Sequence, residues 1–143
     1  MGVFVPVEAV ESQHHVDLCN QQEIAKMASD IWKRYEEYRH DIVKTEAQIV
    51  CLNHEITDIE TDYRDDLEYL DHIDKMLRNP YMNEEYRNVL LDIQDITRRK
   101  KELNQIALEC KKESVQLLRD TVEITRNNAA TTRHTHAIMW RMG

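Results

Sequence analysis

The sequence predicts an all-α fold made of two long amphipathic helices that form a coiled coil. Apolar residues repeat at heptad spacing in residues 24–77 and again in residues 86–124. The 143-residue chain is 32% charged and 6% aromatic, with 2 Gly and 2 Pro, which is typical of long helices. Two such helices can form an antiparallel hairpin or join a hetero-oligomeric coiled coil.

The first helix is predicted from a stripe of sixteen positions spaced alternately three and four residues apart. Fourteen of them are apolar or aromatic, and Thr45 and Asp66 are the exceptions. Such spacing places all sixteen on one narrow face of a helix. The stripe consists of Ile24, Ala28, Ile31, Tyr35, Tyr38, Ile42, Thr45, Ile49, Leu52, Ile56, Ile59, Tyr63, Asp66, Leu70, Ile73 and Leu77.

Capping and breaking residues predict where this helix begins and ends. Asn20 with Glu23 three residues later is typical of a helix N-terminus, so residues 1–19 are predicted to be a flexible tail. Asn79-Pro80 disfavours helical backbone at residue 79. We therefore predict a helix over residues 20–78 and a break over residues 79–83.

The second helix is predicted over residues 84–126, within a coiled-coil region of residues 20–126. Glu84 and Glu85 fall in its first turn, where the helix dipole favours carboxylates. Asn127-Asn128 is expected to end it, which leaves residues 127–143 as a second flexible tail. Its two predicted heptad rows are Val89, Ile96, Leu103, Cys110, Leu117 and Ile124, and Tyr86, Ile93, Lys100, Ala107, Ser114 and Thr121.

An antiparallel hairpin of these helices has a preferred register, in which the numbers of facing residues sum to 166. The two polar exceptions of the first stripe then meet polar residues of the second helix, Asp66 with Lys100 and Thr45 with Thr121. We predict that these four residues set the register. The same register predicts three apolar pairs, Ile73 with Ile93, Leu70 with Ile96 and Tyr63 with Leu103.

A partner-binding surface is expected near the start of the first helix. In this register Ile42 meets Ile124, so residues 24–41 have no partner within a second helix that ends at residue 126. Another chain should then cover them. The predicted partner-binding residues are Ile24, Ile31, Trp32, Tyr35, Tyr38 and Ile42.

Charge and cysteine usage exclude several function classes. With 27 acidic and 19 basic side chains the formal net charge is -8, which disfavours wrapping nucleic acid. The three cysteines are odd in number and far apart, as in proteins of reducing compartments. No segment is long and apolar enough to span a membrane, and the apolar start of residues 1–7 is too short for a signal peptide.

No residue pattern predicts catalysis, a cofactor or a metal, so an enzyme is not expected. The sequence lacks the glycine-rich loops that cradle phosphates. The histidines of residues 14–15 and 134–136 fall in the predicted tails, where no further ligands converge.

Two basic segments could contact nucleic acid. The run over residues 98–101 is expected to face the acidic stretch over residues 58–74, which would screen it from outside partners. After Glu123 there is no further acid, while Arg126, Arg133 and Arg141 remain. We therefore predict at most weak RNA contact, through residues 126–143.

The residues from Ile42 to Ile124 resemble subunit 7 of the THO complex. The most specific part is Glu68-Tyr69 followed by an apolar cluster and Pro80, and then a second heptad row. The resembling apolar residues are Ile73, Met76, Leu77, Leu91, Leu103, Ile106 and Leu118. The glutamate- and lysine-rich C-terminal extension common in that family is missing here.

The resemblance implies a non-catalytic structural subunit of a nuclear assembly. That family pairs with a longer coiled-coil THO subunit in the machinery that couples transcription to mRNA processing and export. The alternative is a cytoplasmic homodimeric coiled-coil scaffold or adaptor, for vesicle tethering, kinetochore or microtubule work. The apolar heptad residues of two identical chains can pack against each other, so both classes fit the pattern.

Overall fold

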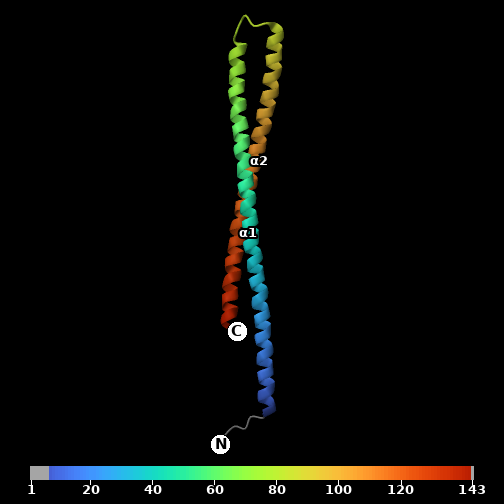
Figure 1. The fold of residues 1–143 in the computed structure, drawn as a ribbon, viewed down its shortest axis with the longest axis vertical. Coiled ribbons are helices and arrows are strands. Elements are labelled where there is room, and N and C mark those ends of the chain that lie inside the picture. Colours follow the sequence, from blue (N-terminus) through green and yellow to red (C-terminus); the bar gives the residue numbers. More distant parts are fainter. Residues whose placement is uncertain (1–6, 143) are drawn as a thin grey trace. The chain divides into compact units, whose positions relative to one another are not determined.

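Two long α-helices make up the part of the chain that the structure describes. The computed structural model describes the backbone of residues 7–142 and the side chains of residues 18–142. Helix α1 spans Val7–Leu77 and helix α2 spans Glu84–Met142, and they pack against each other as a hairpin (Figure 1). The predicted all-α fold and its hairpin arrangement are confirmed.

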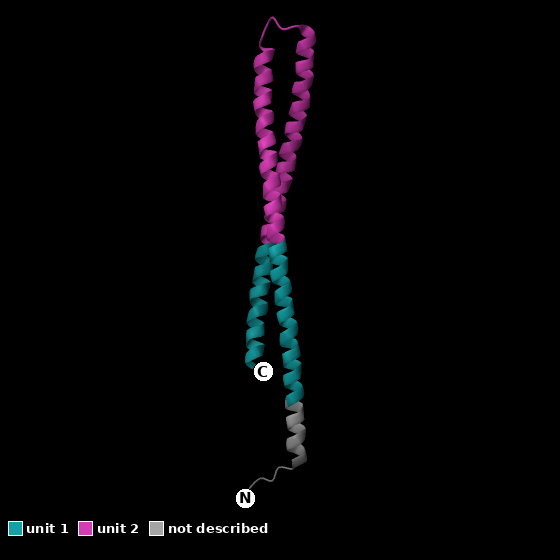
Figure 2. Ribbon diagram, viewed as in Figure 1, with its two compact units in different colours: residues 1–44, 121–143 teal, residues 45–120 magenta. Residues whose placement is uncertain are grey.

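The hairpin divides into two compact units, each with one segment of α1 and one segment of α2 (Figure 2). Unit 1 comprises residues 1–44 and 121–143, and unit 2 comprises residues 45–120 with the turn between the helices. The interior of each unit is therefore one seam between two helices.

Helix α1 begins earlier than predicted. It starts at Val7, so the proposed N-cap Asn20 lies inside the helix, and the prediction of a tail up to residue 19 is wrong from residue 7 onward. Residues 1–6 of that tail lie outside the described residues. Neither Gly nor Pro occurs between residues 7 and 77, and each of the two interior Asn residues costs well below about 1 kcal/mol, so nothing in this stretch stops the helix.

Helix α2 continues well past the predicted end. It reaches Met142, so Asn127-Asn128 does not stop it, and the predicted tail over residues 127–142 is helical. The next residue, Ala129, is buried, and alanine is the best helix former. The hydroxyl of Thr132 donates to the Asn128 carbonyl at 2.8 Å, so the polar Thr132 side chain is hydrogen-bonded within the helix.

The turn between the helices lies where the sequence predicted it. The Asn79 side chain accepts a hydrogen bond from the Tyr81 amide at 3.1 Å, an arrangement common in tight turns. The Asn83 side chain accepts one from the Glu85 amide at 2.8 Å and so caps the start of α2. The predicted break at Asn79-Pro80 and the start of α2 at Glu84 are confirmed.

Arg87 links the first turn of α2 to the end of α1. Its guanidinium donates to the carbonyl of Leu77 and to the carbonyl of Asn79, both at 3.0 Å. These carbonyls lie at or just beyond the end of α1, where backbone acceptors have no partner further along the helix. The planar guanidinium satisfies both at once.

We expect that replacing Arg87 with alanine lowers the free energy of unfolding by about 1–2 kcal/mol, because two charge-assisted bonds to the turn are lost. Arg87→Lys keeps the charge but cannot reproduce the fork, so it should recover less than half of that loss. Urea denaturation followed by circular dichroism measures both. Arg98→Ala, an exposed arginine on the same helix, is the matched control, and an equal loss there would contradict the role of Arg87.

The heptad stripe of α1 forms its inner face. All sixteen predicted positions are buried or half-buried, from Ile24 to Leu77. The prediction for α1 is therefore confirmed along the whole stripe, its two polar exceptions included.

The inner face of α2 lies one residue further along the chain than predicted. Its twelve heptad positions from Arg87 to Thr125 each follow a predicted position by one residue, which corresponds to a rotation of about 100° around the helix axis, and four more positions continue the seam to Met139. The inner seam of α2 consists of Arg87, Leu90, Gln94, Thr97, Lys101, Asn104, Leu108, Lys111, Val115, Leu118, Val122, Thr125, Ala129, Thr132, His136 and Met139, all buried or half-buried.

This rotation corrects two of the three predicted apolar pairs, whereas in the third Ile73 is buried and Ile93 is half-buried. Ile96 and Leu103 are exposed, so the pairs with Leu70 and Tyr63 are wrong. Ile124 is also exposed and does not face inward toward Ile42. The pattern misled because α2 carries two apolar rows, and the row that is richer in apolar residues is not the one that faces α1.

Candidate protein–protein interface

The inner face of α2 is unusually polar for the seam of a coiled coil. Nine of its sixteen positions carry polar or charged side chains. Every buried side-chain nitrogen or oxygen among the described residues nevertheless has a hydrogen-bond partner. Because an unpaired buried polar group is costly, this face can turn inward only where its polar side chains find partners, which lie on α1, on the turn or on α2 itself.

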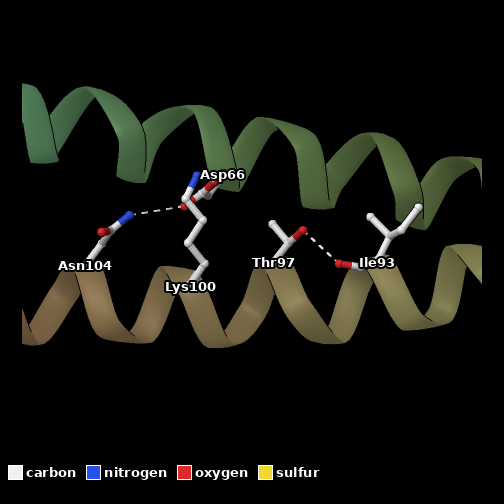
Figure 3. Close-up of polar contacts among 5 residues, drawn as sticks. All are labelled: Asp66, Ile93, Thr97, Lys100 and Asn104. Carbon is white, nitrogen blue, oxygen red and sulfur yellow. Dashed lines mark hydrogen bonds and ion pairs between the residues drawn. The ribbon is translucent and has the colours of Figure 1, made fainter.

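Asp66 is the centre of the polar contacts in unit 2. Its carboxylate lies inside the seam and accepts from Lys100 Nζ at 3.2 Å and from Asn104 Nδ2 at 3.3 Å (Figure 3). On α2 the hydroxyl of buried Thr97 donates to the Ile93 carbonyl at 2.8 Å. The predicted contact between Asp66 and Lys100 is therefore present. Asn104 was missed, since the predicted register did not place it on the inner face.

Three more polar contacts join the helices of unit 2. Gln94 donates to Asp74 at 2.6 Å. Lys111 pairs with Glu55 at 2.7 Å, and Lys112 pairs with Glu60 at 3.7 Å. Together with Asp66, these residues pair the acidic face of α1 with amide and ammonium donors of α2.

The second predicted register pair is Thr45 with Thr121. Thr45 is half-buried, whereas Thr121 is exposed and its carbonyl accepts from the Thr125 hydroxyl at 2.8 Å. The two residues belong to different units. Their role in setting the register stays a prediction.

The outer stripe is an apolar row on the exposed side of α2. We define it as the unit 2 residues Val89, Ile96, Leu103, Ile106, Cys110 and Leu117, all of which are exposed. Ile96 is 65% exposed and Leu103 is 67% exposed. Large exposed apolar side chains that follow one helix face are typical of protein interfaces.

In unit 1, residues 24–42 of α1 do have a partner within the chain, because α2 extends to Met142. Ile24 and Ala28 line an open pocket of about 380 Å³ together with Met139 and Trp140. Ala28 itself is buried. The expectation that residues 24–41 have no internal partner is therefore wrong.

The predicted partner-binding residues lie mostly on the inner face of unit 1. Five of the six are half-buried, namely Ile24, Ile31, Tyr35, Tyr38 and Ile42. Trp32 is 40% exposed, and its ring lies 5.0 Å from that of Tyr35 and 5.0 Å from that of His136 on α2. A role for these residues in binding another chain stays a prediction, and it now concerns a surface that α2 already covers in part.

We expect that truncation after Arg126 exposes the inner face of unit 1. The loss of residues 127–143 removes His136, Met139 and Trp140 from Trp32 and the pocket near Ala28. Amide protection of residues 24–42 in native-state hydrogen exchange should fall by about tenfold or more. Residues 84–96 of unit 2 are the internal control. Unchanged protection in residues 24–42 would contradict the packing of α2 in unit 1.

The C-terminal basic residues also belong to unit 1. Arg126 and Arg133 line an open pocket of about 510 Å³ with Arg39 of α1 and buried Ala129.

In the basic run over residues 98–101 of unit 2, Lys100 pairs across the seam, whereas Arg99 pairs with Asp95 of its own helix at 3.0 Å. The expected pairing of this run with the acidic stretch is thus observed for Lys100.

No group of three or more potential metal ligands occurs among the described residues. His14 and His15 lie outside the residues whose side chains are described. Within the described range, neither helix holds a stretch with the length and hydropathy needed to cross a bilayer.

Comparisons with known proteins give no further guide to function. No family model, no curated protein and no solved structure matches this chain.

Proposed function

We propose that this chain is a non-catalytic structural subunit of a multi-protein nuclear complex. The observation that carries the proposal is the orientation of α2, which turns its polar face toward α1 and its apolar row outward. A chain that functioned alone would be more stable if it buried the more apolar row, since burial of apolar surface is the main stabilising term in folding. The exposed row is available to another chain.

Within this class we propose an assembly that resembles THO and acts in mRNA processing and export. The support is the resemblance of the residues from Ile42 to Ile124, which include the Glu68-Tyr69 segment and the turn at Pro80. Its partner would be a longer coiled-coil subunit of the same complex. We propose no cofactor, no membrane contact and at most weak RNA contact through residues 126–143.

A second candidate is a cytoplasmic homodimeric scaffold or adaptor. The observation in its favour is the regular seven-residue spacing from Val89 through Ile96, Leu103 and Cys110 to Leu117, which would let each residue meet its own copy in a parallel pair.

Two measurements on the full chain separate these candidates. Sedimentation equilibrium over a wide concentration range should show monomers or weak association if the chain is a subunit, and a stable dimer if it is a homodimeric scaffold. Co-expression with the longer coiled-coil THO subunit should give a stoichiometric complex on size exclusion. Failure of that complex to form, with a stable homodimer in sedimentation, would reject the nuclear proposal in favour of the scaffold.

A further inference from the structure

We infer that the outer stripe of α2 docks a basic amphipathic helix of another protein as the third helix of the assembly. The inference rests on the proposed function, and it adds the surface and the chemistry of the partner. It is carried by three features of unit 2, namely the length of the stripe, its place next to the acidic side of α1, and the charge of the unit.

The stripe has the dimensions of a coiled-coil seam. From Val89 to Leu117 it extends over about 42 Å of helix at about 1.5 Å per residue. Its heptad spacing repeats without a charged residue at Val89, Ile96, Leu103, Cys110 and Leu117, and Ile106 widens it in the middle. A helix of about four heptads would match this length.

One edge of the stripe borders the acidic side of α1. Lys100 lies between Ile96 and Leu103 on the surface of α2, since residues three and four apart are neighbours on a helix. Its ammonium reaches Asp66 of α1 at 3.2 Å. Lys111, which follows Cys110, reaches Glu55 of α1 at 2.7 Å in the same way. A helix seated on the stripe would therefore lie close to the acidic residues of α1.

The charges around the stripe select a basic partner. Unit 2 carries 18 acidic and 11 basic side chains, a formal net charge of -7, whereas unit 1 is close to neutral. Beside the stripe, on the edge of α2 that faces away from α1, the exposed charged residues at the heptad position of Ile106 are three acids, Asp92, Glu113 and Asp120, and one base, Arg99, which is paired with Asp95. Lysine and arginine next to the apolar face of a partner helix would meet the carboxylates of this outward edge, whereas the edge toward α1 already holds the Lys100 ammonium paired with Asp66.

A second copy of the chain is a poorer occupant for the same reason. Two stripes in contact would bring two units of charge -7 together, and the acidic edges would lie against each other. Like charges opposite each other at such positions favour a different partner.

The test uses two synthetic helical peptides of four heptads with the same isoleucine and leucine core. One carries lysine and the other glutamate at the positions that flank the core. Fluorescence anisotropy measures the binding of each labelled peptide to the full chain at physiological salt. We expect the lysine peptide to bind about tenfold more tightly or better, from several ion pairs of modest strength.

Variants of the chain distinguish docking on the stripe from general attraction to an acidic protein. Ile96→Glu with Leu103→Glu should reduce affinity for the lysine peptide by about a hundredfold, from the loss of two apolar contacts, even though the chain becomes more acidic. Asn88→Glu with Gln105→Glu adds the same charge at exposed positions of α2 outside the stripe, so its affinity should be unchanged or higher. Circular dichroism verifies that both variants keep the helical content of the parent chain.

Four results would overturn the inference. Equal binding of both peptides would remove the charge argument. Tighter binding of the lysine peptide by the Ile96→Glu, Leu103→Glu variant would show non-specific attraction. If the parent chain is a homodimer in sedimentation and this variant is a monomer, the stripe binds a second copy of the chain. If the co-expressed THO complex forms and also survives in this variant, the proposed function stands and the docking inference fails.

Discussion

Replacing Ile73 with alanine is expected to lower the free energy of unfolding by about 3 kcal/mol. Its side chain has no exposed surface, and it is the one large side chain that is completely buried among residues 18–142. Removal of a buried isoleucine loses its transfer free energy and leaves a cavity, which together cost about 2–5 kcal/mol. In a hairpin with so few buried apolar side chains, the loss is a large part of the total stability.

Urea denaturation of the full chain, followed by circular dichroism, measures this loss. The matched control is Ile96→Ala, the same change on the outer stripe of α2, where the side chain is 65% exposed. It should cost less than about 1 kcal/mol, because little apolar surface is returned to water. Similar losses for the two variants would contradict the rotation of α2 that exposes Ile96.

Lys100→Met and Asp66→Leu are expected to change stability in opposite directions. The Lys100 side chain is 59% exposed, whereas that of Asp66 is 9% exposed. Removal of the lysine leaves a buried carboxylate with only Asn104 as its cross-helix partner, which should cost about 1–2 kcal/mol. Removal of the carboxylate leaves an ammonium that water can solvate, so Asp66→Leu should be neutral or stabilising by up to about 2 kcal/mol.

Comparison of the single variants with the double variant gives the coupling between these residues. Arg99→Met, which breaks the exposed pair with Asp95 inside α2, is the control and should cost less than about 0.5 kcal/mol. If Asp66→Leu destabilises the chain as much as Lys100→Met does, the pair contributes net stability. The gain from Asp66→Leu would come with a less unique register, which extra amide peaks in a nuclear magnetic resonance spectrum would show.

The sequence was sufficient to predict the inner face of α1, though not where the helix begins, because the apolar residues of α1 occupy a single face. Nothing competes with the row from Ile24 to Leu77, so periodicity alone identifies the inner side. The turn was equally accessible, since Pro80 and Asn83 act through local backbone geometry and capping. These features depend on short-range physics and need no knowledge of the other helix.

The orientation of α2 could not be predicted in the same way. Hydrophobicity favours burial of the row of Ile96 and Leu103. In the structure, the face that contains Gln94 and Asn104 lies against α1 instead. That choice depends on whether α1 offers partners for the polar groups, and Asp74 and Asp66 do so. A second signal was present in the apolar residues Leu90, Leu108, Val115, Leu118 and Val122, which also repeat at heptad spacing.

The turn held by Arg87 has a consequence for how unit 2 assembles. The contact between Gln94 and Asp74 closes a loop of 20 residues, whereas that between Lys111 and Glu55 closes one of 56. Closing the longer loop directly costs only about 0.9 kcal/mol more in loop entropy. Once the contact nearer the turn has formed, each contact further from the turn has to close a loop of only a few residues on each helix. The two helices of the hairpin can therefore pair from the turn outward, with a small loop to close at each step, as in fast-folding helical proteins.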